Sequence, residues 1–206
     1  EAGQEMFCEM NDRFLVTARR FLKSDEGQVE DFYYQFREQK KGVAMVHSIT
    51  GHNGFTLRDL VSYDVKHNEA NGEKNLDGTE YNYSWNCGAE GPSRKKEVRE
   101  KRSSQERNAF LMLMLGMASP RILSGDEFGN TQKGNNNAYC QDNAITWLDW
   151  SLLEKNKELF SYVKKLIEFR RNHPLYQSRR YLTGMDSEGL GAPDVSCHGV
   201  EPWNAR

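Results

Sequence analysis

The amino-acid sequence predicts an α/β fold with a parallel sheet, built as part of a (β/α)8 barrel. Helix-like and strand-like segments alternate along the chain, which is typical of parallel sheets covered by helices. A long polar loop follows each predicted strand, and in a (β/α)8 barrel such loops form the functional face. Only two convincing strands are visible in 206 residues, whereas a complete barrel has eight over about 250 residues. We therefore expect a partial barrel.

The first part of the chain contains two predicted helices and one predicted strand. Residues 11–22 have an apolar side chain at every third or fourth position, with Asn11 or Asp12 as the N-cap. The same repeat predicts a second helix over residues 24–36. The apolar run 43–49 has the length of a strand and precedes a glycine-rich turn, as a buried parallel strand would.

A polar stretch, residues 64–104, follows the first strand. It is rich in Asn and Gly and has little apolar periodicity. A loop of this length inside a compact protein is usually functional or disordered. Its aromatic residues Tyr81, Tyr83 and Trp85 favour an ordered, functional loop.

The second half repeats the pattern of helix, strand, loop and helix. A helix is expected to begin at Ser103 or Ser104 and to be buried, because its later residues are apolar on nearly every side. Residues 120–124 then form a short predicted strand, and a second polar loop covers 129–143. The last long helix is predicted over 151–171.

Composition and charge exclude two classes of protein. No apolar run reaches the roughly 20 residues that cross a bilayer, so no membrane association is expected. With a net charge of −2, the chain offers no bulk attraction for nucleic acid.

The four cysteines and five histidines have no metal-ligand spacing, and neither a metal nor a cofactor is expected. Two disulfides are arithmetically possible. Widely separated cysteines nevertheless favour free thiols in a reducing compartment, and hence a cytoplasmic location.

Polar residues at the ends of both strands are candidates for a site. His52 and Asn53 follow the first strand, and Asp126 and Glu127 follow the second. The two carboxylates can act in acid/base chemistry, or they can cap the next turn or pair with Arg or Lys. The amides and aromatic rings of the loops suit carbohydrate recognition, although Asn and Gly also serve turn conformations.

Four long motifs carry a resemblance to a known family. They are GHNGFTLRDLVSYDVKHNEANGEKNLDG, NYSWNCGAEGP, LSGDEFGNTQKGNNNAYCQDNAITWLDW and FRRNHPLY. Over residues 9–200 the chain resembles the glycogen-debranching, isoamylase-type branch of the alpha-amylase family of glycoside hydrolases. The resemblance implies a retaining (β/α)8-barrel hydrolase that cleaves α-1,6 branch linkages in glycogen-like α-glucans.

The resemblance also implies which part of the barrel is present. Residues 1–180 correspond to the last part of the catalytic barrel, with its seventh and eighth strands, and 181–206 to the lead-in to a C-terminal all-β domain. The family uses a carboxylate nucleophile, a carboxylic acid and a third, stabilising carboxylate. The motifs of the first two are not in this sequence. The tripeptide Glu201-Pro202-Trp203 imitates the acid motif, but it lies downstream of the eighth strand, and we interpret it as a coincidence.

Four residues are assigned to the site by this resemblance. His52 and Asn53 occupy the family's His-Asp pair after the seventh strand. His52 matches and would contact the sugar at the cleavage subsite. Asn53 puts a neutral amide in place of the carboxylate that opposes a developing oxocarbenium ion. Asn137 and Gln141 lie where related barrels place sugar-binding side chains.

We expect a fragment of a debranching hydrolase that is inactive by itself and binds α-glucan. The alternative is a non-catalytic α-glucan-binding or regulatory subunit derived from such an enzyme, which Asn53 favours. A branching-type transferase fits the loop motifs less well, and a helical interaction protein does not explain the polar loops. Because the strand edges of a partial barrel lack neighbours, the missing N-terminal part of the barrel or a second copy is an expected partner.

Overall fold

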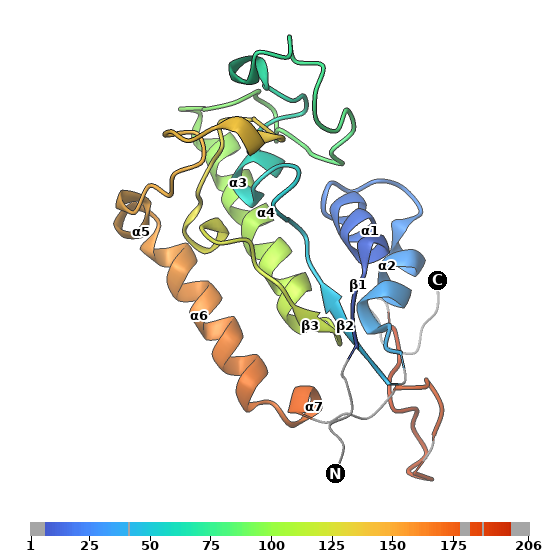
Figure 1. Ribbon diagram of the computed structural model, residues 1–206. Coiled ribbons are helices and arrows are strands. Elements are labelled where there is room, and N and C mark those ends of the chain that lie inside the picture. Colours follow the sequence, from blue (N-terminus) through green and yellow to red (C-terminus); the bar gives the residue numbers. More distant parts are fainter. Residues whose placement is uncertain (1–6, 41, 178–181, 187, 199–206) are drawn as a thin grey trace, which may run out of the picture.

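A three-stranded parallel sheet of order β1–β2–β3 lies at the centre of the fold (Figure 1). The computed structural model describes residues 7–40, 42–177, 182–186 and 188–198. The strands are β1 (Phe7–Met10), β2 (Val43–His47) and β3 (Ser119–Pro120), and both neighbouring pairs are parallel. The predicted α/β arrangement with a parallel sheet is therefore confirmed. The two predicted strands are both present, but each is shorter than expected.

The prediction of only two strands is wrong, because β1 was not expected. It is a run of four residues that pairs with β2 along its length, with Phe7 opposite Val43. All four of its residues are exposed, so no alternation of buried and exposed side chains marks this segment as a strand. A strand this short is defined by its neighbour and not by its own residues.

Two helices cover one side of the sheet, α1 (Asp12–Leu22) and α2 (Gln28–Arg37). The predicted N-cap of α1 is confirmed, since the Asn11 side chain accepts a hydrogen bond from the Phe14 N–H at 3.0 Å. The α2 helix begins later than predicted. Both Ser24 and Gly27 adopt positive φ angles in the connecting turn, which end one helix before the other starts.

The long helix α4 (Lys96–Leu115) begins about two turns before the predicted start. Its first turns are polar and exposed apart from the buried Val98 and Arg102, and one apolar residue makes no repeat that would mark them as helical. Ser103 and Ser104 lie inside the helix and cap nothing. Glu106 of the same helix is buried and pairs with Arg58, whose Nε lies 2.8 Å from Glu106 Oε1.

The remaining helices are short except for one. The predicted helix over 151–171 is divided at Asn156 into α5 (Ser151–Lys155) and α6 (Lys157–Asn172). The other elements are α3 (Leu57–Leu60), η1 (Glu69–Asn71), η2 (Asp126–Phe128), η3 (Ala138–Cys140) and α7 (Pro174–Gln177). Across the described residues, no helix has the length and apolar character that a membrane crossing requires.

The hydrophobic core lies where α1, α4 and α6 meet beside the sheet. Phe14 of α1 is fully buried, and its ring stacks on His47 of β2 with centroids 3.8 Å apart. Phe110 of α4 and Val163 of α6 belong to the same cluster. This packing fixes the strands, and with them the loops that leave their carboxyl ends at the top of Figure 1.

Candidate functional site

Two loops that are far apart in the sequence meet at the carboxyl end of the sheet. The first follows β2 and carries His52 and Asn53, and the second follows β3 and carries the triple Asn 135–137. The Gly54 N–H donates a hydrogen bond to the Asn136 carbonyl at 2.9 Å. The carboxyl ends of parallel strands share one edge of a sheet, and this hydrogen bond joins the loops that leave them.

A buried pair of asparagines, Asn68 and Asn136, connects the polar loop 64–95 to the loop after β3. The Asn136 N–H donates to Asn68 Oδ1 at 2.9 Å, and Asn68 Nδ2 donates to Asn136 Oδ1 at 2.8 Å. Asn136 Nδ2 also donates to the Thr79 carbonyl and to Asn82 Oδ1. The asparagines at 68, 82 and 136 are all buried. The predicted ordering of the long loop is thus explained by specific side-chain contacts.

Gly78 shows how closely the two loops approach each other. A Cβ at this position would lie 2.3 Å from Asn136 Oδ1 and 2.7 Å from Asn68 Nδ2, and the glycine φ is +75°. Only glycine satisfies both constraints.

A second layer of amides surrounds the carboxylate of Asp77. Its Oδ2 accepts hydrogen bonds from Asn71 Nδ2 at 2.7 Å and from Asn137 Nδ2 at 2.9 Å. The Asn71 hydrogen bond is the largest cause that lowers the pKa of Asp77 below its ordinary value. The carboxylate therefore stays charged at neutral pH and holds both loops.

Beneath the exposed loop, the buried carboxylate of Asp126 fixes both ends of the segment 50–57. It accepts hydrogen bonds from Thr50 Oγ1 and, at 2.8 Å, from the Leu57 N–H. Burial raises the pKa of Asp126 to about 7, because desolvation outweighs these two hydrogen bonds. The nearby negative charges of Glu106 and Glu127 act in the same direction.

Arg19 completes this buried layer. Its Nε donates to the Ile49 carbonyl at 2.7 Å, and its Nη1 donates to the Asn82 carbonyl at 3.0 Å. Burial lowers the pKa of Arg19 to about 10, and the charge of Asp126 opposes that shift. One guanidinium therefore joins α1, the end of β2 and the long polar loop.

The two carboxylates that were candidates for acid/base chemistry both serve local structure. Asp126 anchors the segment 50–57 as described, and Glu127 Oε2 accepts a hydrogen bond from the Gly125 N–H at 2.9 Å. The structure favours the alternative in which the two carboxylates cap nearby backbone N–H groups.

The four predicted site residues fall into two groups. His52 and Asn53 are exposed, and within the part of the chain that the structure describes their side chains make no hydrogen bond. Asn137 and Gln141 are half-buried, and their amide groups donate hydrogen bonds to the long polar loop. Gln141 Nε2 reaches the Ala70 carbonyl at 2.9 Å. The Gly54–Asn136 hydrogen bond brings the two groups to one surface.

Sequence reasoning missed the residues that hold this surface in place. Asn68, Asn82 and Arg19 belong to no spacing pattern, because their partners lie 54 to 68 positions away in the chain. The triple Asn 135–137 lies in the second polar loop, whose amides suit either carbohydrate recognition or turn conformations by sequence alone. Its middle member does neither, since Asn136 joins two loops.

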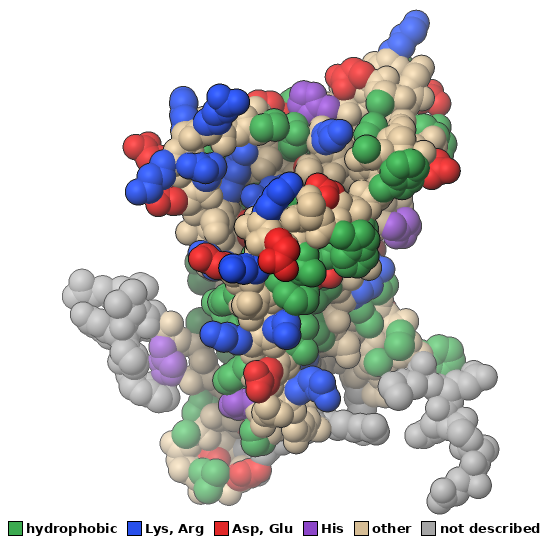
Figure 2. Space-filling view, turned by 90° about the vertical axis from the view of Figure 1, so that its left-hand side faces the viewer, with side chains coloured by type: hydrophobic (Ala, Val, Ile, Leu, Met, Phe, Trp, Pro, Cys, Tyr) green, Lys and Arg blue, Asp and Glu red, His purple; other side chains and the backbone are tan. Residues whose placement is uncertain are grey.

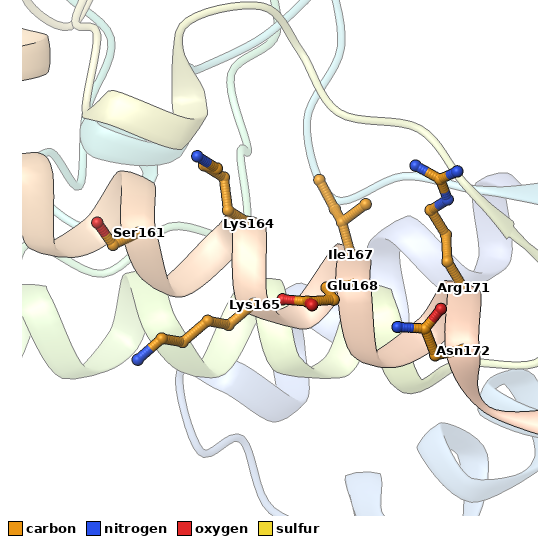
Figure 3. Close-up of a pocket in the computed structure, with 7 residues that line it drawn as sticks. All are labelled: Ser161, Lys164, Lys165, Ile167, Glu168, Arg171 and Asn172. Atoms are coloured by element: carbon orange, nitrogen blue, oxygen red, sulfur yellow. The ribbon is translucent and has the colours of Figure 1, made fainter.

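A separate hollow lies on the outer face of α6, away from the loops (Figure 3). Every side chain that lines it comes from this one helix: Ser161, Lys164, Lys165, Ile167, Glu168, Arg171 and Asn172. The space-filling view of this side of the molecule shows charged side chains of both signs among hydrophobic ones (Figure 2). The hollow has no buried polar group that would orient a ligand, so we do not assign it a site.

Curated proteins similar to this chain are enzymes of glycogen metabolism. This chain is 44% identical over 184 residues to a protein named glycogen debranching enzyme from Klebsiella pneumoniae. The match covers 85% of this chain and 28% of the relative. The chain is also 40% identical over 187 residues to a homologue of the glycogen operon protein GlgX from Mycobacterium tuberculosis, covering 87% of this chain and 26% of the relative. The chain thus spans about a quarter of the length of these relatives. No protein-family profile matches it.

Solved structures resemble this chain in fold. A pullulanase from an Anoxybacillus species, in complex with maltotetraose, matches with a TM-score of 0.57 at 21% sequence identity. The match covers 80% of this chain and 22% of the pullulanase. The fold of the described residues is therefore similar to that of part of a pullulanase. In sequence, the chain is a homologue of part of the glycogen debranching enzymes, and the expected resemblance is confirmed.

The Asn136→Ala variant should lose about 2 kcal/mol or more of unfolding free energy. The substitution removes three side-chain hydrogen bonds and leaves the buried Asn82 Oδ1 without its donor. Asn68 Nδ2 and the Thr79 carbonyl each keep another hydrogen-bond partner. Asn108→Ala is the matched control, because Asn108 is exposed on α4, and it should change stability by less than about 0.5 kcal/mol. Urea denaturation of both variants checks this, and equal stabilities would contradict the role of Asn136.

The pH dependence of stability should contain a contribution from Asp126. Its pKa rises from 3.8 to about 7 on folding, so between these values the folded chain holds the extra proton and stability falls as pH rises. Asp126→Asn replaces the carboxyl group with a neutral amide of nearly the same shape. As the pH rises from about 5 to about 7, the variant should lose on the order of 2 kcal/mol less unfolding free energy than the parent.

The comparison of the two proteins isolates this one carboxyl. Burial lowers the pKa of His47 to about 4, which gives a slope of the opposite sign, but His47 is present in both proteins. Urea unfolding of parent and variant at several pH values measures the difference. Parallel pH profiles would show that Asp126 is ionised in the fold throughout this range.

Proposed function

We propose that this chain forms part of the catalytic barrel of a glycogen debranching glycoside hydrolase. The enzyme would cleave α-1,6 branch linkages in glycogen-like α-glucans by a retaining mechanism. One observation carries the proposal: the identity of 40–45% to glycogen debranching enzymes and GlgX homologues extends over most of the chain. The geometry agrees with it, because the loops after β2 and β3 are fastened into one polar surface at the carboxyl end of a parallel sheet.

The sheet supports the assignment of residues 1–180 to a part of a (β/α)8 barrel. Within the described residues, β1 and β3 each pair with β2 and have no strand on their other side. A groove beside β3 is lined by Pro120, Ile122, Ile167 and Tyr176, and a further strand packed there would continue the sheet. We propose that the rest of the barrel, or a second copy, covers these edges.

Residues 181–206 are proposed to lead into a C-terminal all-β domain. Part of this region lies outside the described residues, including Glu201-Pro202-Trp203. The described residues 182–186 and 188–198 contain no helix or strand, which agrees with a linking segment.

The exposed pair His52 and Asn53 is proposed to face the sugar at the cleavage subsite. The pair is exposed and therefore accessible to a ligand, and the segment that carries it is anchored at both ends by Asp126. Asn137 and Gln141 are proposed to bind sugar with the oxygens that their loop contacts leave accessible, and Tyr81 and Tyr139 are sufficiently exposed to stack on sugar rings. The pullulanase in complex with maltotetraose supports an α-glucan as the ligand class.

Asn53 favours a second candidate, a non-catalytic α-glucan-binding subunit. An amide still forms hydrogen bonds to a sugar, but it supplies no negative charge to a transition state. Such a subunit would keep the binding surface and lose turnover, even with the nucleophile and acid supplied by another chain.

The 206-residue polypeptide, incubated with glycogen or a branched maltodextrin, should release no reducing ends above background. The nucleophile and acid motifs are not in its sequence, and losing one member of a catalytic group costs about as much as losing several. Asn53→Asp in the same polypeptide should remain inactive, because its carboxylate has no reaction to assist. Detectable α-1,6 hydrolysis by either protein would overturn the catalytic assignment.

A test of the role of Asn53 requires a longer protein that carries both missing motifs. There, Asn53→Asp should raise turnover by about 10²- to 10³-fold and change substrate affinity much less. Equal turnover with Asn and Asp would show that residue 53 is not the stabilising position.

A further inference from the structure

The chain contains two Asn-Gly sequences, Asn53-Gly54 and Asn71-Gly72. An asparagine followed by glycine is prone to deamidation, because glycine has no Cβ to hinder attack of its backbone nitrogen on the preceding side-chain amide. Both dipeptides lie in the loops at the carboxyl end of the sheet. The reactivity of the two sites can therefore be compared within one protein.

The side-chain amides of the two asparagines have opposite environments. The Asn71 amide makes four hydrogen bonds: Nδ2 donates to Asp77 and to the Asn137 carbonyl, and Oδ1 accepts from Asn135 and Gln141. Asn53 is exposed, and its side chain makes no hydrogen bond to any residue that the structure describes. Only Asn53 is free to rotate its amide toward the following nitrogen.

The two attacking nitrogens are held alike. The Gly54 N–H donates to the Asn136 carbonyl at 2.9 Å, and the Gly72 N–H donates to the Glu69 carbonyl at 3.2 Å. Each must release one backbone hydrogen bond before it reacts. The difference between the sites therefore comes from the side-chain amides.

We propose that Asn53 is a site of spontaneous deamidation, whereas the loop network protects Asn71. Base removes the proton of the Gly54 nitrogen, which attacks Asn53 Cγ; the new C–N bond closes a succinimide ring, and Nδ2 leaves as ammonia. One water then opens the ring. Hydrolysis at the side-chain carbonyl gives aspartate, and hydrolysis at the backbone carbonyl gives isoaspartate. No oxidant or reductant takes part.

The product places a negative charge where the resemblance assigns a stabilising carboxylate, and this consequence rests on the proposed function. Arg121 lies beside the same loop, since its Nη2 is 2.9 Å from where a Cβ on Gly51 would be. Its positive charge favours an anionic group in this region. Isoaspartate would instead lengthen the backbone by one carbon next to Gly54 and displace the loop.

Peptide mapping by mass spectrometry tests the proposal without any measurement of activity. The purified chain is incubated in native buffer at mildly alkaline pH, and the peptides containing Asn53 and Asn71 are followed with time. Asn53 should convert to aspartate and isoaspartate at least about tenfold faster than Asn71, because the Asn71 hydrogen bonds must open before its ring can close. In urea, where both loops are unfolded, the two rates should become similar.

One variant serves as the control. Asn53→Gln, whose longer side chain would have to close a larger ring, should abolish the early acidic species seen on ion exchange. Equal rates at the two sites in native buffer, or an Asn53 that stays intact while Asn71 reacts, would overturn the proposal. Either failure would leave the assignment of the chain to a debranching hydrolase unchanged, because glucan binding and hydrolysis are separate measurements.

Discussion

The buried pair of Asn68 and Asn136 is the contact on which the rest of the candidate site depends. Each amide both donates and accepts, so neither leaves a polar atom unpaired in the interior. Through Asn136 the pair also reaches Thr79, Asn82 and the backbone of Gly54. Long polar loops lack the apolar area that orders a core, so here side-chain amides take over that role. The result is a rigid surface at the carboxyl end of a very small sheet.

Below this surface, burial and charge divide the loop after β2 into a fixed and a free part. Asp126 holds Thr50 and the Leu57 N–H, and Arg19 holds the Ile49 carbonyl, so both ends of the segment are anchored in the interior. Between these anchors His52 and Asn53 are exposed. The arrangement that would present Asn53 to a sugar also leaves its amide open to attack by the Gly54 nitrogen. Access and chemical lability therefore have a common structural origin.

Sequence patterns predicted the elements whose own residues encode them. The α1 helix, with its Asn11 cap, is set by local periodicity, and β2 is a short apolar run between turn signals. In contrast, β1 is recognised only through its partner strand, and the polar first turns of α4 carry no apolar repeat. The site shows the same division. The motifs located the loops, but contacts such as Asn68 with Asn136 join residues 68 positions apart and follow no spacing rule.

The central claim is that the surface fastened by Asn68 and Asn136 faces an α-glucan. The most direct test is a titration of the isotope-labelled chain with maltotetraose, followed by amide chemical shifts, with the β-linked cellotetraose as control. We expect saturable shifts at His52, Asn53, Asn137 and Gln141 with maltotetraose, and none with cellotetraose. Weak affinity is expected, because the chain spans about a quarter of its relatives. Unchanged shifts in these loops at saturating maltotetraose, or shifts confined to the outer face of α6, would contradict the account.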